Sequence, residues 1–376
     1  MTGPSRTSAQ VSPVSFARGA PSTDIVDVAG LRQAAMDAFD ADPAGLTGYG
    51  TAIGYVPLRQ WIAEKHGVPV DHVLVTNGSM QADAFLFDEL VGPGDAVVTE
   101  RPTYDRTLLG LKERGADLHL VTLREDGIDV EEIAALLDAG VRPTLAHIIP
   151  NFQNPAGYTL SLAKRHRLLE LAREHGFVIF EDDPYVDIRF SGEPLPRMLE
   201  LDGGADSSTV VYASSFSKTV CPGIRVGYLV GPPAIIDRIR RRATNTYIAP
   251  NMVAQGIVNQ FVRGPRYADA LERVRTALAE RVATLDTALR AHLPQATFQR
   301  PEGGYFLWVS LPEGEGHDVA RITTEAAQRG VAIVPGTDFL LEGGHNAFRL
   351  AYSGVPAELI ADGVRRLAEA IEAARA

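Results

Sequence analysis

Short apolar runs alternate with amphipathic stretches from about residue 71 to residue 230. Seven of these runs have the length and composition of strands: His72–Thr76, Ala96–Glu100, Leu118–Leu123, Leu145–Ile149, Phe177–Glu181, Thr209–Ala213 and Val226–Val230. Between many of them lie stretches with helical apolar spacing: Met80–Leu90, Tyr104–Arg114, Val130–Ala139 and Leu162–His175. This alternation predicts an α/β fold with a mainly parallel, doubly wound, seven-stranded sheet. Uninterrupted apolar strands such as 177–180 fit burial on both faces of that sheet.

The pattern changes after residue 264. Pro265–His292 has helical spacing throughout, and strands near 305–309, 331–334 and 348–352 then alternate with helices near 319–329 and 357–374. This second pattern predicts a smaller α+β domain formed by the N- and C-terminal parts. We therefore divide the chain into a flexible N-terminus (1–13), an arm that packs on the small domain (14–45), a large domain (46–264) and a small domain (265–376).

Composition narrows the function classes. The net charge of -11 over 376 residues argues against a nucleic-acid surface. The single cysteine excludes an internal disulfide and fits the cytoplasm. No apolar run reaches the roughly 20 residues that span a membrane, and residues 1–13 lack the apolar middle of a signal peptide. The histidines form no metal-ligand spacing, so we predict no metal site.

The segment Ser214–Tyr228 places a lysine where burial would make it reactive. Lys218 follows the predicted strand that ends at Ala213, and removal from water lowers an ammonium pKa and frees the amine as a nucleophile. The hydroxyls of Ser215 and Ser217 and the fork-shaped cation of Arg225 suit a phosphate. An amine beside a phosphate site indicates a Schiff base to a phosphorylated aldehyde, namely pyridoxal 5'-phosphate. A surface lysine in a polar loop is the alternative.

Other strand ends carry polar residues that suit the same ligand. Asp182 follows a buried strand at a position where ligands bind parallel sheets, and it could pair with a protonated ring nitrogen or cap a turn. Asn154 could donate to a phenolate oxygen or serve its own turn. Gly78 and Ser79 would expose backbone N–H groups to an anion, although serine is also an ordinary N-cap. Tyr104 could stack on a flat ring or pack in the core.

Three further features have a plain and a functional interpretation. Arg349 lies alone in an apolar strand, where a buried guanidinium needs an anion: a structural carboxylate or that of a substrate. Cys221 fits a packed small residue better than a nucleophile. The glycine-rich 49–54 segment is not a dinucleotide fingerprint, because no strand precedes it.

Together these segments resemble the fold-type I pyridoxal-phosphate enzymes, and within them the class I/II aminotransferases of the α-aminoadipate and kynurenine aminotransferase group. The motifs occur in the family's order from about Ser15 to the C-terminus: SFARGAP, YGTAIGYVPLR, TNGSMQ, RPTYDR, PNFQNPAGYTLS, EDDPY, SSFSKTVCPGIRVGY, PEGGYFLW, VPGTDF and FRLAY. The resemblance implies an enzyme that exchanges an amino group between an amino acid and a 2-oxo acid. It also implies a homodimer with active sites at the interface.

The resemblance further implies a role for each site residue. Lys218 would hold the cofactor as an aldimine and later move a proton between the substrate Cα and the cofactor. Asp182 would pair with the pyridine nitrogen, Tyr185 and Asn154 would bind the phenolic oxygen, and Tyr104 would stack on the ring. The phosphate would be held by Gly78, Ser79, Met80, Ser215, Ser217 and Arg225, with Tyr49 reaching the phosphate of the neighbouring subunit. Substrate contacts would come from Arg349, Asn154, Arg18 and Gly19.

Two positions depart from the family's pattern. Arg18-Gly19-Ala20-Pro21 stands where relatives usually show paired glycines before the proline, and Met80 stands where many carry a polar residue. One alternative is therefore another pyridoxal-phosphate reaction on the same scaffold, such as elimination, replacement, decarboxylation or carbon–carbon bond formation. A lower-ranked alternative is the ligand-sensing domain of a regulator, for which we expect no room before Ser15 for a winged helix.

Overall fold

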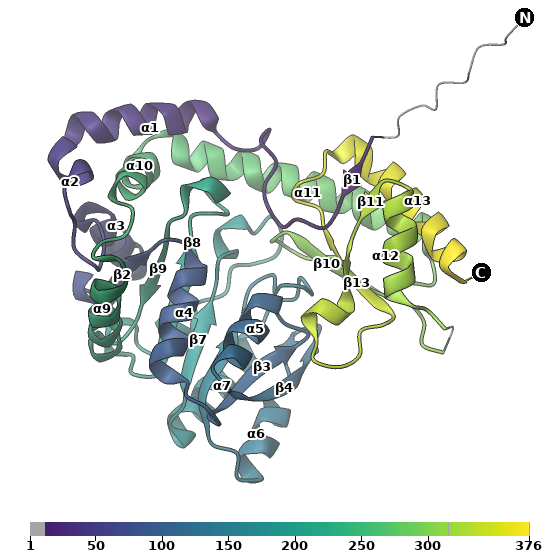
Figure 1. Ribbon diagram of the computed structural model, residues 1–376, viewed down its shortest axis with the longest axis horizontal. Helices are drawn as coiled ribbons and strands as arrows, with labels where there is room; N and C mark the ends of the chain where they lie inside the picture. Colours follow the sequence, from purple (N-terminus) through teal and green to yellow (C-terminus); the bar gives the residue numbers. More distant parts are fainter. Residues whose placement is uncertain (1–11, 315, 376) are drawn as a thin grey trace, which may run out of the picture.

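The computed structural model describes residues 12–314 and 316–375 and has a large and a small domain (Figure 1). Most of the predicted flexible N-terminus, residues 1–11, lies outside the described residues. Within the part of the chain that is described, no helix is long and apolar enough to cross a membrane.

The large domain is built on one mixed, mainly parallel sheet, as predicted. Its strand order is β2-β9-β8-β7-β6-β3-β4-β5. The bounds are β2 Val73–Thr76, β3 Ala96–Arg101, β4 Asp117–Arg124, β5 Gly127–Ile128, β6 Pro143–Ile148, β7 Val178–Asp182, β8 Val210–Ser215 and β9 Gly227–Val230. β9 runs antiparallel to both of its neighbours, and β5 is a two-residue strand that pairs with the edge strand β4 and raises the total from seven to eight.

Helices cover both faces of this sheet (Figure 1). One face packs against α4 (Ser79–Leu90), α5 (Asp105–Glu113) and α9 (Pro233–Tyr247). The other packs against α3 (Val56–His66), α6 (Val130–Asp138), α7 (Leu162–His175), α8 (Met198–Leu201) and α10 (Met252–Arg263). In β2, Val73 and Val75 point to one cluster and Leu74 to the other, as the two-residue period of a strand requires. The sheet is therefore buried on both sides and exposes ligand-binding groups only at its ends.

The small domain packs α11 (Arg266–His292), α12 (Val319–Gln328) and α13 (Ala357–Arg375) around two short sheets. β13 (Ala347–Ala351) pairs antiparallel with β10 (Phe306–Ser310) and β12 (Val334–Pro335). The single strand predicted over 331–334 is divided, because β11 (Val331–Ala332) pairs instead with β1 (Val14–Ser15). This pairing ties the N-terminal segment to the small domain.

The segment that follows β1 contacts both domains. Phe16 and Ile25 pack in the small-domain core. The next helix, α1 (Val28–Ala41), is capped by Asp27, whose carboxylate accepts from the N–H of Gly30. Ala34 and Ala38 of α1 lie in the same apolar cluster as α10 of the large domain. A short helix, α2 (Pro43–Thr47), completes this segment. The predicted arm (14–45) thus packs its first part on the small domain and its helix α1 on the large domain. The domain boundaries at residues 45 and 264 stay predictions.

Candidate functional site

A cavity of about 240 Å³ lies where β7 and β8 end and α4 begins. Twelve of the residues predicted for the site line it: Arg18, Gly19, Ser79, Met80, Tyr104, Asn154, Asp182, Tyr185, Ser215, Ser217, Lys218 and Arg225. Ala20, Asp83, Ile149, Pro184 and Pro222 complete the lining. The cavity is therefore assembled from the large domain and from residues 18–20 of the N-terminal segment.

Three predicted residues lie outside this lining. Gly78 has φ +86, and a Cβ at this position would overlap the guanidinium of Arg225, so the turn leaves room only for glycine. Arg349 lies behind Asn154, to which it donates. Tyr49 is 93% exposed and turned away from the cavity of its own chain.

Lys218 is the amine at the centre of the cavity. Its Nζ donates to the backbone oxygen of Gly19 at 3.0 Å and lies 5.4 and 5.0 Å from the ring centroids of Tyr185 and Tyr305. Burial, assisted by the positive charges of Arg349 and Arg225, lowers the pKa of Lys218 to about 8, against the opposing charge of Asp182. A substantial fraction of this amine is thus neutral and nucleophilic near physiological pH.

Asp182, at the end of β7, faces the same cavity with one free oxygen. It is 5% exposed, and its Oδ1 is buried without a hydrogen-bond partner among the described residues. Its Oδ2 lies 3.5 Å from Nε2 of His147, a fully buried residue on β6. A buried carboxylate oxygen of this kind needs a donor, and a protonated ring nitrogen supplies one.

Two serine hydroxyls and an arginine lie together in the lining of the cavity. Ser215 Oγ donates to Ser217 Oγ at 2.9 Å, and Arg225 Nη1 donates to the same oxygen at 3.3 Å. Arg225 has φ 51, a left-handed conformation that costs free energy for a non-glycine residue, and it directs the guanidinium toward the Gly78 turn. Ser79 begins α4 there, so the helix adds backbone N–H groups to the cation and hydroxyls. This combination fits a phosphate.

Tyr104 lines the cavity, and Arg349 lies outside the lining, next to Asn154. Tyr104 precedes α5, and its hydroxyl donates to Met80 Sδ at 3.7 Å. Arg349 on β13 donates to Asn154 Oδ1 at 2.9 Å and to Ala17 O at 2.7 Å, while its Nε has no partner among the described residues. The guanidinium lies 4.4 Å from the ring centroid of Phe306 and 4.8 Å from that of Phe339. No carboxylate pairs with it in the described chain, so it keeps capacity for an anionic ligand.

Arg18 separates this cavity from a neighbouring one. A second cavity, of about 600 Å³, shares Arg18, Ala20 and Pro222 with the first and continues along Val26, Leu31 and Cys221. Among the described residues that line it, Arg18 is the only charged one. Gly19 beside it cannot carry a side chain, because a Cβ would overlap the ring of Phe306. A ligand that extends past Lys218 would therefore meet one cation and an apolar groove.

Sequence reasoning did not single out Asp83 or His147. Asp83 lies one helical turn after Ser79 and lines the cavity, and its Oδ1 is buried without a partner in the described chain. His147 interrupts the apolar strand β6. Each was visible in the sequence only as a polar residue inside an otherwise apolar periodic segment.

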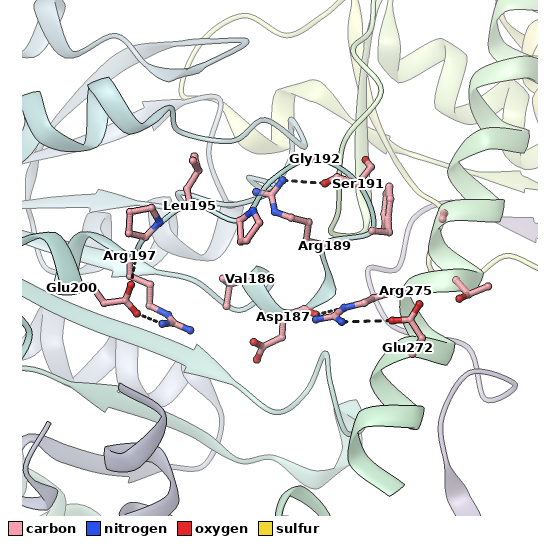
Figure 2. Close-up of a pocket in the computed structure, with 15 residues that line it drawn as sticks. Val186, Asp187, Arg189, Ser191, Gly192, Leu195, Arg197, Glu200, Glu272 and Arg275 are labelled. Carbon is pink, nitrogen blue, oxygen red and sulfur yellow. Dashed lines mark hydrogen bonds and ion pairs between the residues drawn. The ribbon is translucent and has the colours of Figure 1, made fainter. Parts of the chain in front are cut away.

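A larger cavity has a different character. It measures about 850 Å³ and is lined by residues from Val186 to Glu200 and by α11 (Figure 2). Its arginines are already paired, Arg197 with Glu200 and Arg275 with Glu272 (Figure 2). The described residues that line it include no lysine and no unpartnered carboxylate, so the smaller cavity is the candidate site. In the described chain, no group of three or more His, Cys, Asp or Glu side chains could hold a metal ion.

Comparisons with known proteins point to one family. Residues 12–367 match the model of aminotransferase class I and II. The aromatic-amino-acid aminotransferase 1 of Thermococcus litoralis is 32% identical over 96% of this chain and 88% of its own length. The α-aminoadipate aminotransferase of Thermus thermophilus, solved with N-(5'-phosphopyridoxyl)-L-leucine, superposes with a TM-score of 0.91 at 32% identity and covers 96% of this chain and 92% of its own. The kynurenine aminotransferase of Pyrococcus horikoshii, solved with PMP, kynurenine and its product, superposes with a TM-score of 0.89 at 31% identity. The match covers 97% of this chain and 92% of that one.

Proposed function

Because the chain belongs to the class I and II aminotransferase family and is a pyridoxal-phosphate-dependent transferase, we propose that the described cavity is its active site, where an amino group passes between an amino acid and a 2-oxo acid. One observation carries this assignment. The amine of Lys218, whose pKa is lowered to about 8, the unpartnered oxygen of Asp182 and the side chains of Ser215, Ser217 and Arg225 face a single cavity. These are the three groups that an aldehyde, a ring nitrogen and a phosphate require.

The residues present fit the cofactor at both of its ends. Ser79, Met80, Ser215, Ser217 and Arg225, with the Gly78 turn, would hold the phosphate, and Asp182 would hold the ring nitrogen. Tyr104 would cover the ring, while Tyr185 and the amide nitrogen of Asn154 would donate to the phenolic oxygen. Bound in this way, the cofactor supplies an electron sink for charge that develops on the substrate Cα.

Lys218 would then move the proton. Its amine donates to the backbone oxygen of Gly19 and lies near the rings of Tyr185 and Tyr305, so contacts with three residues fix its orientation in the cavity. An amine with a pKa near 8 can accept a proton from one carbon and return it to another, and a positioned general base of this kind contributes roughly 10²–10⁴-fold.

Arg349 would bind the substrate α-carboxylate. The Arg349→Lys variant is expected to raise KM for amino acids by about tenfold or more, because lysine keeps the charge but loses the bidentate fork, and a hydrogen bond to a charged group contributes about 1.5–3 kcal/mol. Cofactor affinity should stay unchanged. Steady-state kinetics and a cofactor titration measure the two quantities. Arg275→Lys, in the cavity of Figure 2, is the control. A KM equal to that of the native enzyme, with a lowered melting temperature, would assign Arg349 a structural role.

The substrate side chain would extend past Arg18 into the neighbouring apolar cavity. The relatives are named for aromatic amino acids, α-aminoadipate and kynurenine, all of which have long side chains. We therefore propose donors with a long side chain that carries an anionic or carbonyl group within reach of Arg18.

Arg18→Ala tests this specificity. Acidic donors are expected to lose about tenfold or more in kcat/KM, whereas neutral donors of similar length should change little, because only the acidic donors lose a charge-assisted contact. A screen of matched donors such as α-aminoadipate and norleucine measures the difference. Equal effects on both classes would remove Arg18 from the specificity site.

We also propose that the enzyme is a homodimer in which Tyr49 reaches the partner's phosphate site. Tyr49, Val56, Met80 and Ile248 are large side chains that are exposed in the single chain. Tyr49→Phe should weaken cofactor affinity while the dimer persists in analytical ultracentrifugation. A monomeric native enzyme with full cofactor affinity would contradict this arrangement. We keep the cytoplasm as the proposed location.

The reaction itself is tested by product analysis. Native enzyme incubated with an amino donor alone should convert its bound cofactor to the amine form and release one equivalent of 2-oxo acid, visible in the absorbance spectrum and by mass spectrometry. Adding a 2-oxo acid should restore the aldehyde form. Release of ammonia or carbon dioxide in place of the 2-oxo acid would contradict amino-group transfer.

A further inference from the structure

Asp182 shares its end of the cavity with a second carboxyl group. Asp83 on α4 lines the same cavity and is 7% exposed, and its Oδ1 is buried without a partner in the described chain. Asp182 Oδ1 is also buried and unpartnered. Two carboxyl groups that face one small cavity cannot both ionise cheaply, because like charges in a poorly solvated site repel. One of the two is therefore expected to carry a proton.

The surroundings decide which of the two is protonated. Asp182 lies 3.5 Å from His147 Nε2 and interacts with the ammonium of Lys218. No ion pair of Asp83 is present in the described chain, and burial together with the charge of Asp182 raises the pKa of Asp83 well above its usual range. The other titratable groups that interact with the pair are Glu100 on β3, Tyr104 and Tyr185, and the charges of Arg225 and Arg349 act on Lys218 beside it. Burial also raises the pKa of Glu100, to about 8. Asp83 is therefore the member of the pair to which the proton is assigned.

We propose that Asp83 is a neutral carboxylic acid that positions Asp182, donating its O–H toward the free oxygen of Asp182 and so holding it ionised for the ring nitrogen of the cofactor. A carboxyl donor to a charged acceptor makes one of the stronger hydrogen bonds in proteins. Asp83 would act through Asp182 and touch neither the substrate nor the reacting carbon. The inference rests on the proposed function, because it assigns the ring nitrogen to Asp182.

The test measures binding rather than turnover. Pyridoxamine 5'-phosphate has no aldehyde, so it binds without bonding to Lys218. Its dissociation constant is measured by fluorescence titration from pH 5 to 9 in the native protein, Asp83→Asn and Asp83→Leu. The asparagine keeps a neutral donor, so the pH at which binding is half lost should match that of the native protein. Leucine removes the donor, so this pH should rise by about one unit, equivalent to about tenfold in affinity on the acidic side.

Controls separate this effect from misfolding and from failure of the proposed function. Asp88→Leu, on the same helix but paired with Arg114, should leave the midpoint unchanged. Circular dichroism verifies that each variant is folded. Two results would overturn the role of Asp83 while the active-site assignment stands. In the first, the pH of half-lost binding in Asp83→Leu equals that of the native protein. In the second, this pH shifts in Asp83→Asn by as much as in Asp83→Leu. Absence of binding by the native protein at every pH would overturn both.

Discussion

Replacing Lys218 by alanine should abolish covalent attachment of the cofactor and lower turnover by more than about 10²–10⁴-fold, because both the nucleophile and the general base are lost. Borohydride reduction of the native holoenzyme followed by peptide mapping should label one peptide, which contains Lys218. Lys65 and Lys164 are held in ion pairs with Asp187 and Asp126 and should stay unlabelled. A labelled peptide that contains Lys65, Lys112 or Lys164 would contradict the assignment.

The same lysine predicts a pH dependence of cofactor capture. Burial lowers the pKa of Lys218 to about 8, below that of an exposed lysine. The fraction of the amine that is neutral and reactive therefore increases as the pH rises and reaches a plateau above pH 8. The rate of covalent capture by cofactor-free enzyme should therefore rise between pH 6 and 8 and level off well before 10.5, where an ordinary lysine titrates. Stopped-flow absorbance measures this rate. A rate that still climbs steeply above pH 9 would show that Lys218 is not desolvated.

Asp182→Asn should bind the cofactor and lose about 10²–10³-fold in turnover, because an amide cannot stabilise a protonated ring nitrogen by charge. Asp183→Asn is the matched control. Asp183 is fully buried and accepts from Asn151 Nδ2 with both of its oxygens, at 3.0 Å each, so its role is structural. Its substitution should lower the melting temperature with little change in kcat of the folded fraction. The reverse pattern in the two variants would move the ring-nitrogen contact to Asp183.

Continuous apolar runs made the large sheet predictable. β7 and β8 are buried on both faces, so burial and sequence pattern agree at nearly every residue. Two of the helices that were not predicted bury polar residues. α10, for example, is enclosed by α1, α2 and α3, and it buries Gln255 and Asn259 together with its apolar residues. Arg59 of α3 is likewise buried, because it donates to the backbone oxygen of Val73.

Site residues at strand ends could be inferred from the sequence, since the carboxyl ends of parallel strands meet at one edge. Asp182 and Ser215 end neighbouring strands and do line one cavity. The place of Asp83 depends instead on how α4 packs against that edge, which no local pattern specifies. The division of the N-terminal segment between two domains also depends on packing, because β1 and α1 find partners 200 residues or more along the chain.

That N-terminal segment has an evolutionary consequence. Apart from Tyr49, the groups proposed to bind the cofactor belong to the sheet, its helices and its loops between residues 78 and 225, whereas Arg18, Gly19 and Ala20 reach the cavity on a separate stretch of backbone. Donor preference can therefore change by substitution or recombination in the first forty-five or so residues while the catalytic groups are inherited intact. The exchange is restricted mainly by Phe16, which must fit the small-domain core, and by Ala34 and Ala38, which must fit α10. Chimaeras joined in the exposed connection after α2 would transfer substrate range from one parent and chemistry from the other.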